Sequence, residues 1–351
     1  MLYHAAHRYS HLERQHWRKW CVRQDETTNR PSTPTVTQSG KTECYCTLDG
    51  DLFYSAAKRA ISQSSHVKLR LGTAVRQIVG GDTPSVETSD GEVVHAAWIF
   101  DARPPVQNQA NRLVQQFMGY EIKTERDVFD PTTVELMHFQ PSSNGLHFFY
   151  VLPYSPRNAL VETTWISPAS FKPDFGTELK QFITSSVGSV TYDVVYEEKG
   201  SLNLSLSHTK PCDASHVVPL GRGAGTLRAS TGYAFLETLE HVERIATSLK
   251  SHASAGDLNN WVPATFKRPA LDEWMDTIFL KVLERDWSKS SRYFMQLFER
   301  LDADTMVAFL SGRASWRQRL LVSSALPTLP FAAQALSIWI DRAPRFLGAR
   351  R

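Results

Sequence analysis

One ordered run of segments constrains the fold of this chain more than any other feature. Residues 51–60 (DLFYSAAKRA) carry apolar side chains at helical spacing, and residues 66–71 alternate as a strand does. Residues 86–94 predict two short strands around an Asp90-Gly91 turn. Residues 97–103 predict a buried strand that ends in polar side chains. A helix, a hairpin and a strand in this order predict an α/β domain.

Further along the chain, the patterns predict a second sheet followed by helices. Residues 129–139, 145–152 and 159–164 are expected to form strands, because each is a short run rich in apolar and β-branched residues. Residues 232–250 are expected to form a helix, and from residue 270 onward apolar residues recur at helical spacing. We therefore expect a sheet domain and then a helical C-terminal region.

The first 42 residues are mostly polar. The first 20 are expected to be helical, which would place His4, His7 and His11 on one face. A metal site there would need a carboxylate or cysteine in register, and none is present, so we prefer a solvated helix face and predict no metal site. Residues 22–42 are rich in turn formers and predict a loop or linker.

Composition limits the classes of protein that remain. The chain has 351 residues, 42% hydrophobic and 21% charged, which fits a folded protein with one large or two interlocked domains. A net charge of +3 gives no reason to expect nucleic-acid binding. The cysteines Cys21, Cys44, Cys46 and Cys212 form no C-x-x-C pair and predict free thiols in a reducing compartment. The first residues lack the apolar core of a secretory signal, and no window approaches the roughly 18 apolar residues of a membrane span.

Glu162 is the first candidate for chemistry. It interrupts an apolar strand, NALVETTW, where a carboxylate is unfavourable unless it is paired or protonated. Burial raises the pKa of a carboxyl group, as a general acid that works near neutral pH requires. A solvent-facing glutamate or a structural ion pair is the alternative.

A glycine segment is the second candidate. Gly221, Gly223 and Gly225 are followed by a predicted helix, an arrangement in which backbone N–H groups can approach an anion. Ser230 or Thr231 would cap that helix. A flexible loop is the alternative, and the late position of the segment excludes the first βα turn of a dinucleotide-binding unit.

Several separate stretches, taken in order, resemble the bacterial lycopene cyclases. The similarity covers about residues 42–340. It is carried by LVQQFMGYEI (113–122), FDPTTVELMHF (129–139), LHFFYVLPYSPRNALVETTWI (146–166), the glycine segment running into STGYAF (230–235), and the C-terminal run from Ile278 to Phe331.

The resemblance implies an α/β (α+β) flavoprotein fold of the glutathione-reductase type with a mixed-sheet substrate domain. Members close β-ionone rings at the ends of lycopene, giving γ- or β-carotene as intramolecular lyases, with reduced FAD, no net redox change and NADPH as the expected reductant. Glu162 matches the family's catalytic glutamate. Phe148, Tyr150 and Trp165, with Phe149, would stabilise a carbocation by cation–π contact, although core packing is the alternative for each. The expected FAD contacts are Asp101, Arg103, Gly221, Gly223, Gly225, Ser230, Thr231 and Gly232.

The sequence departs from the family in three places. The G-x-G-x-x-G turn expected near the start is missing, so we interpret the chain as N-terminally truncated, without the first Rossmann βα turn. His138 occupies the position of a family aspartate and is kept as a catalytic candidate, and Asn203 replaces a proline.

The expected divisions of the chain are a polar segment 1–42, the remainder of the FAD domain 43–105, a substrate sheet 106–210, an FAD-contacting segment 211–250 and a membrane-associated helical region 251–351.

The last apolar stretch predicts contact with a membrane. Residues 326–340 (LPTLPFAAQALSIWI) are apolar and include Trp339, which would suit docking on a membrane surface. The alternative to membrane docking is a buried C-terminal helix with a solvated basic end. The basic residues nearby are Arg313, Arg317, Arg319, Arg342, Arg345, Arg350 and Arg351. We expect a peripheral protein on the cytoplasmic face of the cell membrane that binds membrane-dissolved lycopene, with other carotenoid enzymes as further candidate partners. A flavoprotein monooxygenase or reductase acting on an isoprenoid, or a non-catalytic isoprenoid-binding remnant, are the alternatives.

Overall fold

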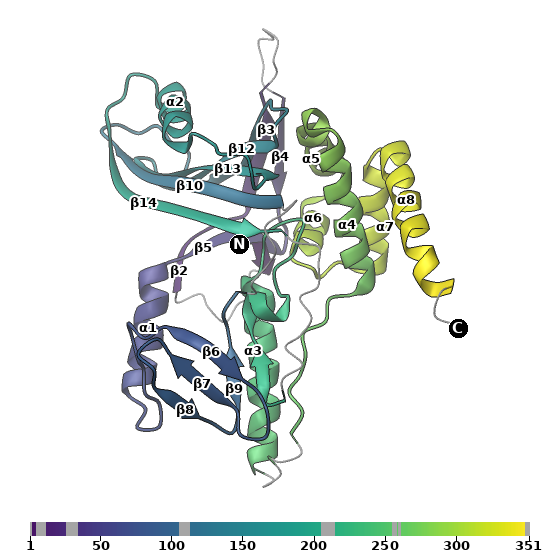
Figure 1. Cartoon of the computed structure of the whole chain (residues 1–351). Helices are drawn as coiled ribbons and strands as arrows, with labels where there is room; N and C mark the ends of the chain where they lie inside the picture. The colour runs from purple at the N-terminus through teal and green to yellow at the C-terminus, as the bar shows by residue number, and fades with distance from the viewer. Residues whose placement is uncertain are drawn as a thin grey trace.

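A large mixed sheet forms the centre of the molecule (Figure 1). The computed structural model describes residues 2–4, 12–25, 34–104, 113–204, 215–254, 258 and 261–347. The sheet has seven strands in the order β14-β10-β13-β12-β11-β3-β4, and all neighbours are antiparallel except β11 and β3. The bounds are β3 Lys19–Gln24, β4 Thr35–Ser39, β10 Leu113–Thr124, β11 Thr133–Gln140, β12 Leu146–Ser155, β13 Asn158–Pro168 and β14 Tyr192–Asn203.

The two faces of this sheet bury different side chains. Helix α2 (Phe175–Val187) covers one face and packs against Phe149 and Val161. The opposite face packs against the C-terminal helices, where the Phe139 and Phe294 rings lie 5.6 Å apart. Because side chains alternate along a strand, β10, β12 and β13 contribute to both cores.

The C-terminal helices form a layer beside the sheet (Figure 1). Polar caps start two of them: Asp302 caps α6, and Ser315 and Gln318 form a capping box at α7. The bounds are α4 Ala270–Arg285, η4 Trp287–Lys289, α5 Ser290–Arg300, α6 Ala303–Leu310, α7 Trp316–Ala325 and α8 Thr328–Leu347.

A smaller lobe lies at the other end of the molecule (Figure 1). Its parallel strands β9 (Ile99–Asp101) and β15 (Val217–Pro219) pair although about a hundred residues separate them, and α3 (Phe235–Ser254) packs beside them. The remaining elements are β1 Leu2–His4, β2 Glu13–Trp17, β5 Glu43–Leu48, α1 Gly50–Ser62, β6 Val75–Val79, β7 Ser85–Thr88, β8 Val93–His95 and η2 Gly221–Ala224.

The structure confirms the α/β class, the mixed sheet and the helical C-terminal region. Three local predictions are wrong. The first 20 residues contain strands β1 and β2 and the start of β3 in place of a helix, because Trp17 and Trp20 are buried side chains of strands. Strands β3 and β4 occupy part of the expected 22–42 linker, and residues 66–71 are exposed and form no strand. His7, His11 and Cys212 lie outside the described residues.

Candidate active site

Two glutamates meet across a glycine on one face of the central sheet. Gly119 of β10 is paired with Glu162 of β13 on one side and with Glu198 of β14 on the other. The two carboxyl groups form a hydrogen bond with each other. A Cβ atom at residue 119 would lie 3.1 Å from Cγ and 3.3 Å from Oε1 of Glu198. The missing side chain of Gly119 therefore makes room for the pair.

Glu162 is held as a neutral acid. Burial raises its pKa to about 8, and the charge of Glu198 and the hydrogen bond to it act in the same direction. The Thr164 hydroxyl donates to Glu162 Oε1 at 2.7 Å and opposes this shift. Burial also raises the pKa of Glu198. At neutral pH the pair therefore retains a proton on Glu162.

Tyrosine side chains surround the two glutamates. Tyr150 of β12 lies directly opposite Glu162 in the strand register, and its hydroxyl is hydrogen-bonded to that of Tyr233. Burial raises the pKa of Tyr233 to about 12 and raises the pKa values of Tyr150 and Tyr45 well above their usual range. These phenols stay neutral, so the site offers O–H groups and aromatic faces without added negative charge.

The structure brings only part of the expected substrate pocket to Glu162. Phe148 lies two residues from Tyr150 on the same face, and their rings are 5.2 Å apart. Trp165 lies on the opposite face, where its indole stacks on His147 at 4.1 Å and donates to Glu178 at 3.0 Å. Phe149 also faces α2 and stacks on Phe182 at 3.9 Å.

His138 is not brought to Glu162 either. It lies on the α2 face between Glu135 and Asp25, with nitrogen–oxygen distances of 2.9 and 2.8 Å. Although burial opposes protonation, the hydrogen bonds and charges of Glu135 and Asp25 raise the pKa of His138 overall. In this arrangement its charge is balanced locally, on the far side of the sheet from the carboxyl pair.

The expected nucleotide-contact residues near the glycine segment do come together. The parallel pairing of β9 and β15 places Asp101 beside Pro219, and the Leu220 N–H donates to the Asp101 carbonyl at 2.8 Å. Arg103 forms an ion pair with Asp101 at 2.9 Å. Gly221 and Gly225 have positive φ angles, and a Cβ atom at Gly223 would lie 3.0 Å from the Arg103 carbonyl oxygen. Glycines therefore let the 221–225 turn pass close to Asp101 and Arg103.

Residues 230–232 connect the glycine segment to the start of helix α3. Helix α3 begins at Phe235, so the prediction that Ser230 or Thr231 caps it is wrong. Ser230 instead donates to Asp276 of α4 at 2.8 Å, and the Thr231 hydroxyl accepts from the Tyr233 N–H. Gly232 has φ +71°, and a Cβ atom there would clash with the Gln115 side chain.

Two cavities flank the 228–233 segment. One, of about 290 Å³, extends from Arg222 of the glycine segment to Gly232 and Tyr233, and so reaches the tyrosine beside the carboxyl pair. The other, of about 260 Å³, lies among helices α4–α8 and is lined mainly by apolar side chains, with Ser230, Thr231 and Asp276 among its polar groups. Apolar lining residues include Met137, Phe279, Phe294, Met306, Leu326 and Phe331.

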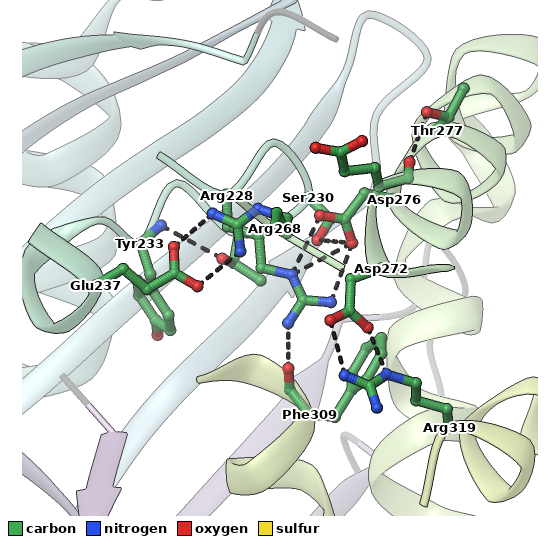
Figure 2. Close-up of polar contacts among 12 residues, drawn as sticks. Arg228, Ser230, Tyr233, Glu237, Arg268, Asp272, Asp276, Thr277, Phe309 and Arg319 are labelled. Atoms are coloured by element: carbon green, nitrogen blue, oxygen red, sulfur yellow. Dashed lines mark hydrogen bonds and ion pairs between the residues drawn. The ribbon is translucent and has the colours of Figure 1, made fainter. Parts of the chain in front are cut away.

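Ion pairs tie this segment to the helical layer (Figure 2). Arg228 is 1% exposed, donates to both oxygens of Asp276 and bonds to the Phe309 carbonyl. Arg268 pairs with Glu237 of α3, and Arg319 of α7 donates to Asp272 of α4 at 2.6 and 2.8 Å. The Arg228 contacts hold the segment that carries Tyr233 against α4 and α6, and the other two pairs join α3 to the residues before α4 and α7 to α4.

The fold defines the class of protein. Solved structures that share it include a geranylgeranyl bacteriochlorophyll reductase-like protein from Thermoplasma acidophilum (TM-score 0.52, 12% identity, 89% of this chain and 80% of that chain). The halogenase PltM is also similar, with a TM-score of 0.54 and 14% identity over 91% of this chain and 69% of that chain. A flavin-dependent brominase has a TM-score of 0.51 and 13% identity over 94% of this chain and 83% of that chain. At these identities the likeness shows the fold alone, a fold shared with a halogenase solved in complex with FAD and with a flavin-dependent brominase.

The sequence then identifies the family within this class. The profile described as "Lycopene cyclase protein" matches residues 3–336, so the chain belongs to the lycopene cyclase family. The lycopene beta-cyclase of Pantoea ananas is 25% identical over 284 residues, 77% of this chain and 71% of the relative. That of Paracoccus sp. (strain N81106 / MBIC 01143) is 24% identical over 296 residues, 82% and 73%.

Proposed function

We propose that the protein is a lycopene β-cyclase, an intramolecular lyase whose general acid is Glu162. One observation carries the proposal: Glu162, half-buried on one face of the central sheet, lies beside a second carboxyl group that favours its protonated form. Membership of the lycopene cyclase family and the two lycopene beta-cyclase relatives support the substrate.

The reaction requires an acid of this kind. An alkene is a poor base, so the donor must be neutral at working pH and held out of water. Protonation of the terminal double bond gives a tertiary cation, an internal double bond attacks it, and loss of a ring proton completes the β-ionone ring. Water would trap the cation as an alcohol, and the Tyr150 and Phe148 rings on the Glu162 face help to exclude it. Each aromatic face would stabilise the cation by about 1–2 kcal/mol at most.

FAD is the cofactor we propose. The turn of Gly221, Gly223 and Gly225 is the proposed diphosphate contact, since Gly221 and Gly225 have positive φ angles and a Cβ atom at Gly225 would meet no atom within 4 Å. The cavity between this turn and Tyr233 supports a flavin ring placed beside the carboxyl pair. A reduced, anionic flavin there, with NADPH as the proposed reductant, would stabilise a nearby cation electrostatically.

The substrate side of the proposal rests on the apolar cavity and on the outer face of the helices. Lycopene is insoluble in water, and a cavity lined by methionine, leucine and phenylalanine suits a polyene. Helix α8 contributes Phe331 and Ala335 to that cavity, and it also exposes Leu329, Leu336 and Trp339. We propose that these exposed residues of α8 dock on the cytoplasmic face of the cell membrane, which also gives access to other carotenoid enzymes.

Expression in a lycopene-accumulating cell tests the function. The wild-type chain is expected to convert lycopene to γ- or β-carotene, which have the same mass as lycopene. A product of changed mass would indicate a monooxygenase or reductase, and no product at all would contradict cyclase activity. Glu162→Gln is expected to lower turnover by about 10²-fold or more, because the amide cannot donate the proton. Full conversion by Glu162→Gln would overturn the assignment of the acid.

A further inference from the structure

We propose that Glu198 is a second catalytic residue, the base that removes the ring proton after Glu162 has protonated the substrate. The proposal rests on the proposed cyclase function and deepens it. Cyclisation adds one proton and removes one proton, so each turnover needs both an acid and a base. A pair of carboxyl groups that shares one proton supplies both.

The strand register places the two groups together. Strand β10 runs between β13 and β14 (Figure 1), and its Gly119 faces both glutamates. Neighbouring strands are about 4.8 Å apart, so two long side chains that flank a glycine can meet above it. The carboxyl groups of Glu198 and Glu162 are hydrogen-bonded to each other. The side chains nearest to a Cβ atom placed on Gly119 would be those of Glu198 and Leu160.

The charges of the pair explain why it holds a single proton. Two carboxylates in contact repel each other, and burial disfavours a doubly charged pair further. Two neutral carboxyl groups are disfavoured near neutral pH because at least one can ionise and accept the hydrogen bond of the other. The resting pair is therefore neutral Glu162 donating to anionic Glu198.

The proton balance closes within the pair. The Glu162 O–H bond breaks as a C–H bond forms at the terminal alkene, and the resulting cation is attacked by the internal double bond to form the ring C–C bond. A ring C–H bond then breaks, its electron pair forms the ring double bond, and its proton is bound by Glu198. Transfer of that proton across the hydrogen bond to Glu162 restores the starting state, with no oxidant or reductant consumed.

Turnover measured against pH tests the assignment. The wild-type rate should be bell-shaped, because Glu162 must be protonated and Glu198 ionised. Glu198→Gln should lower kcat by about 10²-fold or more and remove the acid limb, since the base no longer titrates. Glu197→Gln is the matched control, because Glu197 is exposed and its neighbour Tyr120 does not face the pair. A Glu198→Gln profile that keeps both limbs would overturn the proposal.

A second measurement does not depend on activity. Infrared titration of the protonated-carboxyl band should show Glu162, confirmed by its loss in Glu162→Gln. In Glu198→Gln that band should titrate at lower pH, and in Gly119→Ala also, because the added methyl group displaces Glu198. An unchanged midpoint in both variants would contradict proton sharing. If the wild type forms no product but the Glu162 band titrates at lower pH in the two variants, the cyclase function is contradicted and the proton-sharing pair is supported.

Discussion

A neutral Glu162 affects stability as well as catalysis. In the unfolded chain this glutamate ionises near its ordinary pKa of 4.5, whereas in the folded protein it keeps its proton up to about pH 8. Between these two values the unfolded state releases a proton that the folded state holds. The contribution of Glu162 to stability is therefore complete below about pH 4.5 and is lost as pH rises toward 8 and above.

Glu162→Gln should remove this pH dependence. We expect the free energy of unfolding of the variant, relative to wild type, to increase as pH rises from about 5 to about 9, because the amide never ionises. Urea denaturation at several pH values, followed by circular dichroism, measures the difference. Glu197→Gln should show no such trend, since Glu197 is exposed. A constant difference between Glu162→Gln and wild type would show that Glu162 ionises normally in the folded state.

The spacing of residues in the sequence predicted part of the site but not all of it. Glu162 was identifiable as a carboxylate in an apolar strand, and Trp165, three residues later, falls on the other face of the same strand. That spacing was a readable signal, and the expectation of Trp165 beside Glu162 overlooked it. Glu198 gave no comparable signal, because its role depends on the pairing of Gly119 with two strands that are distant in sequence.

At the scale of elements, buried ion pairs join the segment around Tyr233 to the C-terminal helices. Arg228 and Asp276 have side chains that are 2% and 3% exposed, and Ser230 adds a third contact. A buried pair contributes little net stability compared with apolar packing, but the loss of one partner leaves a buried charge unbalanced. The pair therefore makes the position of this segment dependent on α4.

Asp276→Ala should destabilise the protein by about 3–5 kcal/mol, because Arg228 would remain buried without its anion. Lys289→Ala provides the control, since the Lys289–Asp286 pair is exposed and its loss should change stability very little. Urea denaturation compares the two variants. The double variant Arg228→Met/Asp276→Leu should recover much of the loss. Equal, small effects of Asp276→Ala and Lys289→Ala would contradict the role assigned to the pair.

Elements with strong periodicity were predictable from sequence, and elements defined by distant partners were not. The helices after residue 270 and strands β11, β12 and β13 follow from their own apolar spacing. Strand β14 carries Glu197, Glu198 and Lys199 in succession and is mostly exposed, so its sequence resembles a loop. Its twelve residues are held by pairing with β10. The same physical reason explains β3 and β4, which sequence reasoning assigned to other structures.

At the scale of the whole molecule, one surface of the helical layer stands out for its apolar side chains. In the part of the chain that the structure describes, no single helix is long and apolar enough to cross a membrane; α7 with α8 up to Ile340 passes that test only as a pair bent by 117°. Leu329 is 84% exposed, and Leu320 and Trp339 are also exposed. Of the basic residues expected to meet lipid, Arg319 instead pairs with Asp272 and Arg313 with Glu43. The side chains of Arg342, Arg345, Arg350 and Arg351 lie outside the part of the chain that the structure describes.

Replacing the exposed apolar residues of α8 should therefore weaken membrane binding. We expect Leu329→Ser/Trp339→Ser to lower the fraction of protein that floats with phosphatidylcholine–phosphatidylglycerol vesicles by about tenfold, because each side chain loses an apolar contact with the acyl region. Val262→Ser is the matched control, since Val262 is 79% exposed but lies on the segment before α4. Binding of the double variant should remain weak when the anionic lipid is increased. Flotation equal to wild type, or an equal loss in Val262→Ser, would show that α8 is not the surface that meets the membrane.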